Sequence, residues 1–141
     1  MTERNPDTPN FTGDWRLIPS RSKVPGPKVK GMHMRITHKG PDFLQVTRAE
    51  YEDGRVVTRT FGGRINGEEF INQLGNQSEV RSRASWVGRE LLIETLVSAP
   101  GGVQHLKDYW SLIEGGSKLK MEHRDDPLKG FIGILERTDD K

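Results

Sequence analysis

Two arginines, Arg48 and Arg59, are the side chains whose positions most directly suggest binding chemistry. Each lies in a segment where residue types alternate as they do along a β-strand, whose successive side chains point to opposite faces. By that alternation Arg48 shares a face with Leu44 and Val46, and Arg59 shares a face with Phe61. If these apolar faces point inward, both guanidinium groups lie inside the molecule. A buried guanidinium requires an anionic or hydrogen-bonding partner.

Two interpretations of this arginine pair remain open. In one, the arginines belong to a solvated outer face or to an internal salt bridge, for which Glu50 and Glu94 are candidate partners. In the other, Arg48 or Arg59 holds the carboxylate or phosphate of a mostly apolar ligand. The second interpretation makes an arginine the polar anchor of a ligand-binding site.

The four histidines are not spaced as a metal-binding pair on one strand. His33 and His38 are five residues apart, which places them on opposite faces of a strand. Binding of a metal or of haem would need ligands gathered from separate strands. We therefore expect neither a metal nor any other cofactor.

The segment His105-x-x-Asp108-Tyr109 contains groups capable of acid–base chemistry. On a strand His105 and Tyr109 share one face, whereas Asp108 lies on the other face together with Trp110. The face of Trp110 has the character of a core, so we expect the His105 face to lie outside. The chain contains no nucleophile elbow, phosphate-binding loop or dinucleotide-binding fingerprint.

The side chains that we expect to contact a ligand combine these arginines with apolar and aromatic residues on predicted inner faces. Trp15, near the start, is instead expected to pack across one end of the fold. The candidate ligand-binding residues are Met34, Ile36, Arg48, Arg59, Phe61, Phe70, Trp86, Ile93 and Trp110.

These residues lie on short segments with two-residue periodicity, joined by turns rich in glycine, proline, asparagine and aspartate. Residues 19–28 contain three prolines and are expected to form a crossing loop. Residues 1–10 are expected to form a flexible tail. We expect strands at residues 12–18, 29–38, 43–51, 55–61, 69–74, 80–86, 90–97, 103–113, 118–124 and 129–137.

Short connections between successive strands make neighbours in the sequence pair antiparallel. The expected fold is therefore all-β, a single up-and-down β-barrel of about eight to ten strands that spans residues 11–138. A Greek-key sandwich is the alternative, and residues 19–28 are the only candidate for its long connection. Only 32% of the 141 residues are hydrophobic, which suits a barrel with a partly polar interior.

Composition narrows the classes of partner. The net charge is +2 and no block of lysine or arginine stands out, so nucleic-acid binding is not expected. The absence of cysteine excludes disulfides and thiol chemistry. No apolar run is long enough for a membrane span, and the polar start lacks the features of a signal peptide, so a cytoplasmic location is expected. The oligomeric state is left open.

The segment Phe11-x-Gly13-x-Trp15-Arg16-Leu17 resembles the first strand of the calycins, which include lipocalins, fatty-acid-binding proteins and bacterial lipocalin-like barrels. The similarity continues as a pattern over nearly the whole chain. It comprises the hairpin glycines Gly40 and Gly54, the run Trp86-Val87-Gly88-x-x-Leu91, the run Trp110-Ser111-Leu112 and the closing Leu135-Glu136-Arg137. The resemblance implies a calycin barrel with an interior able to take a small ligand.

The chain also departs from those families. The proline-rich residues 19–28 stand where a fatty-acid-binding protein has its helical lid, and no helix follows the barrel as in a lipocalin. The Arg-x-Tyr that grips a carboxylate on the last strand of fatty-acid-binding proteins has no match in residues 131–135. The bacterial lipocalin-like barrels fit best, and they imply a fold without a defined activity.

We therefore expect binding of a small hydrophobic or amphipathic molecule inside the barrel. Two alternatives stay open: a cofactor-independent isomerase or cyclase that uses the barrel interior as its active site, and a filled barrel that binds another protein. A cavity above about 300 Å³ is required by the first two and not by the third.

Overall fold

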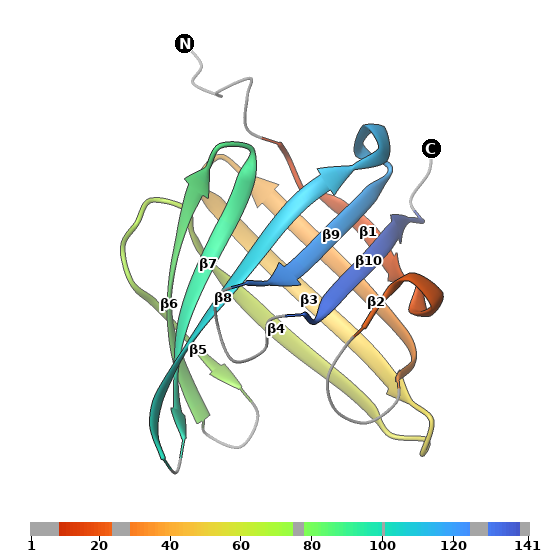
Figure 1. Cartoon of the computed structure of the whole chain (residues 1–141), viewed down its shortest axis with the longest axis horizontal. Helices are drawn as coiled ribbons and strands as arrows, with labels where there is room; N and C mark the ends of the chain where they lie inside the picture. Colours follow the sequence, from red (N-terminus) through yellow and green to blue (C-terminus); the bar gives the residue numbers. More distant parts are fainter. Residues whose placement is uncertain (1–8, 24–28, 75–77, 100, 125–129, 139–141) are drawn as a thin grey trace.

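The computed structural model describes residues 9–23, 29–74, 78–99, 101–124 and 130–138. Ten antiparallel strands form one sheet that curls into a nearly closed barrel (Figure 1). Two short 3₁₀ turns, η1 (Pro19–Arg21) and η2 (Glu114–Gly116), interrupt the strands. The strands are β1 (Gly13–Leu17), β2 (Val29–Lys39), β3 (Asp42–Tyr51), β4 (Val56–Arg64), β5 (Phe70–Leu74), β6 (Ser78–Val87), β7 (Glu90–Ala99), β8 (Gly102–Ile113), β9 (Lys118–His123) and β10 (Ile132–Arg137).

The strand order confirms the up-and-down barrel and excludes the Greek-key alternative. Around the sheet the strands run β4-β3-β2-β1-β10-β9-β8-β7-β6-β5, so every neighbour except the β1–β10 pair is adjacent in the sequence. The β1–β10 ladder joins the two ends of the chain, with Trp15 opposite Arg137. Parts of two expected elements, residues 24–28 of the loop and residue 129 of the last strand, lie outside the described residues. So do residues 1–8 of the expected tail.

Alternation along the strands separates an inner from an outer face, as predicted for most of the chain. In β6 the side chains of Val80, Ser82 and Ala84 are buried, whereas Arg81 and Arg83 are exposed. The exception is β3. There Phe43 and Ala49 are buried, whereas Leu44 is 45% exposed.

Of the two open interpretations of Arg48, the structure therefore agrees with the solvated outer face, because Leu44, Val46 and Arg48 do not point inward. These side chains lie on the outer face, and Arg48 is exposed opposite Thr58 of β4. The inner face of β3 carries Gln45 and Thr47 instead. The apolar side chains of β3 do not mark its inner face, because this part of the interior is a partly polar cavity rather than a dry core.

One end of the barrel is closed by aromatic side chains. Trp15 is fully buried, and its indole N–H donates to the carbonyl of Phe11 at 3.0 Å. The Phe11 ring stacks on Trp86 of β6 and on His38 of β2. These two strands are far apart in the strand order of the barrel. The segment that precedes β1 thus spans this end of the barrel, as the position of Trp15 predicted.

Contacts to β2 hold this first segment in place. The Phe11 N–H donates to Nδ1 of the buried His38 at 3.2 Å, and the Asn10 amide donates to the His38 carbonyl at 3.3 Å. The Thr12 hydroxyl donates to the same carbonyl at 3.0 Å. Residues 9 and 10, expected as part of the tail, are therefore joined to the barrel.

The barrel has one seam, between β4 and β5, where no backbone ladder forms within the described residues. The Asn72 side chain of β5 bridges it: its amide N–H donates to the Gly62 carbonyl at 3.0 Å, and its oxygen accepts from the Gly62 N–H at 3.1 Å. Behind this bridge the Phe70 ring lies directly against Gly63. Strand β4 continues through Gly62 and Gly63, beyond residue 61, where the sequence predicted its end.

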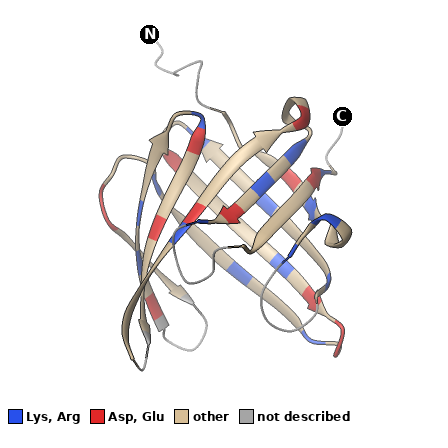
Figure 2. Ribbon diagram, viewed as in Figure 1, with Lys and Arg blue, Asp and Glu red and all other residues tan. Residues whose placement is uncertain are grey.

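Positively and negatively charged residues are interspersed along the strands (Figure 2). Many form cross-strand ion pairs, such as Arg35 with Asp14 at 2.7 Å and Arg64 with Asp42 at 2.8 Å. Among the described residues, no helix has the length and apolar character needed to cross a bilayer.

Candidate ligand-binding cavity

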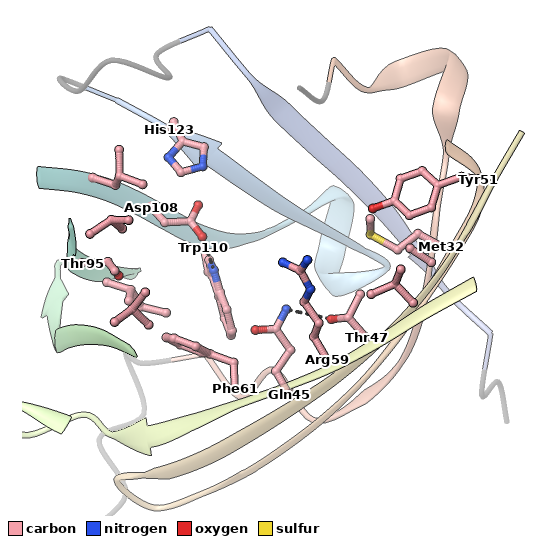
Figure 3. A pocket seen from close by; sticks show the side chains of 16 residues that line it. Met32, Gln45, Thr47, Tyr51, Arg59, Phe61, Thr95, Asp108, Trp110 and His123 are labelled. Carbon is pink, nitrogen blue, oxygen red and sulfur yellow. Dashed lines mark hydrogen bonds between the residues drawn. The ribbon is translucent and has the colours of Figure 1, made fainter. Parts of the chain in front are cut away.

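A cavity of about 400 Å³ lies inside the barrel, between two walls. Strands β2, β3 and β4 form one wall, and β6, β7, β8 and β9 form the other; no described residue of β1, β5 or β10 lines it. Figure 3 shows side chains from both walls converging on the space between them. The lining residues are Met32, Gln45, Thr47, Ala49, Tyr51, Val57, Arg59, Phe61, Val80, Ile93, Thr95, Val97, Leu106, Asp108, Trp110 and His123.

Apolar side chains form most of this lining. Trp110 is 1% exposed and Ile93 is 3% exposed, so both are firmly packed by the residues behind them. The Phe61 ring packs near Phe43 and Phe70, with ring centroids 5.9 and 5.8 Å away. The cavity therefore rests on a rigid aromatic floor that continues into the closed end of the barrel.

Polar groups occupy two separate places on the walls. Arg59 lies on the β3–β4 wall, opposite Thr47 in the strand ladder and close to Gln45 (Figure 3). Asp108 of β8 and His123 of β9 are opposite each other on the second wall. The Asp108 carboxylate accepts a hydrogen bond from the Trp110 indole N–H at 3.1 Å. This bond fixes the orientation of the Asp108 and Trp110 side chains. Such segregation gives the cavity one cationic wall and one wall with an acid and an imidazole.

Four of the nine sequence-predicted binding residues line this cavity: Arg59, Phe61, Ile93 and Trp110. Met34 and Ile36 face inward but are buried below it in the core. Phe70 and Trp86 pack against the same core. Arg48 lies on the outer face, as described above. The structure thus brings together one arginine and three apolar residues of the predicted set.

Sequence reasoning missed most polar residues of the cavity. Gln45 and Thr47 did not stand out in the sequence, because their neighbours Leu44 and Val46 carry the apolar pattern of that segment. His123 lies near the end of β9 and has no flanking pattern that marks it. Alternation did place two polar lining residues on inner faces, Arg59 with Phe61 on β4 and Asp108 with Trp110 on β8.

The predicted outward orientation of His105 is confirmed. Its side chain is exposed, and its Nε2 lies 3.0 Å from Oε1 of Glu94 on the outer face. Glu94 is therefore a partner of His105 rather than of an interior arginine. Within the described residues, no three histidine, aspartate or glutamate side chains gather in the manner of a metal site.

Comparison with known proteins gives likeness in structure only. No protein-family model matches the chain, and no curated protein matches its sequence. Among solved structures, a variant of the fluorescent protein UnaG shares 16% identity, with a TM-score of 0.63 over 92% of this chain and 97% of that chain. A REP1-NXSQ fatty acid transporter shares 14% identity, with a TM-score of 0.61 over 93% of this chain and 98% of that chain.

Lipid binding protein 8 of Caenorhabditis elegans is similar to the same degree, with 10% identity and a TM-score of 0.65 over 91% of this chain and 95% of that chain. At identities this low the likeness concerns the fold. It agrees with the strand order, in which ten strands meander around a nearly closed barrel. The chain therefore shares the fold of these structures, an up-and-down antiparallel β-barrel.

Proposed function

We propose that this protein binds a small apolar or amphipathic molecule in the interior of its barrel. The observation that carries the proposal is the cavity of about 400 Å³, which falls in the range of roughly 300–1,000 Å³ typical of ligand pockets. Mostly apolar walls with a few polar groups match the lining that such pockets have. At about 30 Å³ per water-sized unit, the cavity has room for about a dozen non-hydrogen atoms.

In this proposal Phe61, Ile93 and Trp110 contact the apolar part of the ligand, and Arg59 contacts its polar end. Met34, Ile36, Phe70 and Trp86 support the cavity floor from below rather than touch the ligand. The buried, close-packed floor keeps the lining in place before binding, which lowers the entropic cost of association.

The test is calorimetric titration of decan-1-ol, a neutral amphiphile of suitable size, into the protein and two variants. Ala49→Phe places a ring in the cavity from a lining position that is 5% exposed, and we expect it to weaken binding at least tenfold. Leu44→Phe places the same ring on the outer face of the same strand, and we expect unchanged binding. Binding that survives Ala49→Phe would contradict an interior site.

A second candidate function is cofactor-independent acid–base catalysis in the same cavity. One observation favours it, the ladder position of Asp108 opposite His123, with both side chains lining the cavity. Catalysis predicts that a bound ligand is chemically changed. Chromatography and NMR spectroscopy of the ligands recovered from the protein separate the two functions, because a binding protein returns them with unchanged covalent structure, whereas an isomerase or cyclase rearranges its ligand even when the mass stays the same.

A further inference from the structure

Arg59 is the one arginine or lysine among the described residues that line the cavity. Its side chain points from β4 into the interior and is solvent-accessible there (Figure 3). Within the described part of the chain, no carboxylate forms an ion pair with it. Its N–H donors are therefore hydrated while the cavity is empty, and they remain available to an anionic group of a ligand that enters between the apolar walls.

Thr47 lies directly opposite Arg59 in the β3–β4 ladder, so its hydroxyl and the guanidinium share one patch of the wall. The Gln45 amide nitrogen lies 3.2 Å from the Thr47 hydroxyl oxygen and 3.1 Å from the sulfur of Met34. Gln45, Thr47 and Arg59 therefore form a group of neighbours on two adjacent strands, with Met34 behind them on β2.

The Met34 sulfur determines which way the Gln45 amide faces. A thioether has no hydrogen to donate, so the atom of Gln45 that faces it is the donating nitrogen and not the oxygen. That nitrogen carries two hydrogens, and its other neighbour is the Thr47 hydroxyl oxygen, which it serves as a donor. Because the hydroxyl oxygen accepts this bond, the hydroxyl hydrogen of Thr47 points elsewhere and is available as a donor.

We propose that Arg59 and Thr47 form the binding site for the carboxylate head group of the ligand, with Gln45 as the residue that positions the Thr47 hydroxyl. This inference rests on the proposed function of the cavity. The guanidinium donates two parallel hydrogen bonds to a planar carboxylate, and the hydroxyl donates a further one. A single cationic side chain balances the single charge of a carboxylate, whereas a phosphate monoester carries about two charges.

The site lies on a different wall from the one that the resemblance implied. There the carboxylate is gripped from the last strand, but no described residue of β10 lines the cavity here. The arginine of that strand, Arg137, lies over the Trp15 ring and donates to the carbonyls of Thr12 and Gly116. On β4, Phe61 lies one inward position nearer the closed end than Arg59, and Val57 one position nearer the opposite end. The head group is thus held midway along β4, with the apolar chain directed toward Phe61 and Trp110.

The outer face of the same hairpin supplies a matched control. Arg48 of β3 lies opposite Thr58 of β4, so an arginine and a threonine also face each other there, with both side chains exposed. Substitution of either pair removes the same chemical groups from the same two strands. Only the Thr47 and Arg59 pair lines the cavity.

The experiment compares decanoate with decan-1-ol, two ligands of similar shape that differ in head-group charge, by calorimetric titration. We expect the unmodified protein to bind decanoate at least tenfold more tightly. Arg59→Met removes the charge at similar length and should reduce this preference to about one. Thr47→Val and Gln45→Leu should each reduce this preference several-fold. Arg48→Met and Thr58→Val should leave the preference unchanged.

Each contrary outcome has a distinct meaning. Equal binding of the two ligands by the unmodified protein would overturn the anion site and leave the apolar cavity function intact. A preference that falls as much with Arg48→Met as with Arg59→Met would overturn it too, because the effect would then come from overall charge. If Gln45→Leu weakens both ligands equally, Gln45 supports the fold and does not position Thr47. Failure of both ligands to bind would contradict the cavity function itself.

Discussion

At the scale of single residues, Arg124 shows how outer-face contacts hold the strands around the cavity. Its guanidinium donates to Glu90 of β7 at 2.8 Å and to Glu122 of β9 at 3.0 Å, and it lies 4.3 Å from the centre of the Tyr109 ring of β8. One side chain thus ties three strands of the second wall together. Hydrogen bonding from Arg124 is the main reason that the pKa of Glu90 lies below its usual value.

Replacement of Arg124 should destabilise the barrel. We expect Arg124→Met to lower the free energy of unfolding by about 1–2 kcal/mol at neutral pH, because it removes two partly buried charge-assisted hydrogen-bond partnerships. Urea denaturation followed by tryptophan fluorescence measures the change. Arg48→Met, at an exposed position of β3, serves as the control and should change stability by less than about 0.5 kcal/mol.

The same contact makes part of the stability dependent on pH. The folded-state pKa of Glu90 is lowered, so its contribution is present above the ordinary glutamate pKa of about 4.3 and is lost as the pH falls through the lower folded value. The stability difference between the unmodified protein and Glu90→Gln should therefore be largest near neutral pH and shrink below about pH 4. A stability difference that grows on acidification would show that the pKa of Glu90 is not lowered in the folded protein.

At the scale of elements, the seam between β4 and β5 is closed by side chains instead of a backbone ladder. Asn72 donates to the backbone C=O of Gly62 and accepts from its backbone N–H, which is the pairing that a neighbouring strand would supply. The Phe70 ring covers the inner side of the seam against Gly63. The barrel therefore remains shut at a place where its strands are not paired.

Loss of the Asn72 bridge should weaken this seam. Asn72→Ala leaves both polar groups of the Gly62 peptide without this partner, and we expect a loss of about 1–2 kcal/mol in unfolding free energy. In Asn72→Ala, amide hydrogen exchange should accelerate more at Gly62 than at other positions of β4. Gln73→Ala, at the exposed neighbouring position of β5, is the control. Equal exchange in both variants would mean that the bridge does not protect the seam.

A methyl group at Gly63 should also disturb the seam. A β-carbon there would lie 2.5 Å from atoms of the Phe70 ring, so the ring must move away and the seam must open. We expect Gly63→Ala to cost about 1–3 kcal/mol of stability. Gly31→Ala in β2 adds the same atom where no other atom lies within 4 Å, and it should change stability much less.

The sequence predicted most strands and turns because two-residue alternation is a local signal. It failed in β3, where Gln45 and Thr47 face a cavity and Leu44 faces solvent, so polarity no longer reports the face. The Asn72 bridge had no sequence signal at all, because a side-chain link across an unpaired seam depends on which strands meet in space. Burial was predictable where the interior is dry and unpredictable where it is polar.

At the scale of the whole molecule, a modest apolar content is enough because the interior is filled at one end and hollow in the middle. The closed end gathers Phe11, Trp15, Trp86 and Trp110 into one packed cluster, and the cavity of about 400 Å³ lies above it. Strand periodicity and short connections predicted the barrel, and the position of Trp15 near the start predicted the residue that packs across one end. The position of the cavity required knowledge of which faces of distant strands converge.

Native mass spectrometry of the protein purified from its own source tests the central claim most directly. We expect a population whose mass exceeds that of the chain by one small molecule, which is released on denaturation and which Ala49→Phe does not retain. Recovery of a carboxylic acid of about a dozen non-hydrogen atoms would agree with both the cavity and its Arg59 site. Repeated detection of the bare chain alone, under conditions that preserve weak complexes, would contradict ligand binding in the barrel.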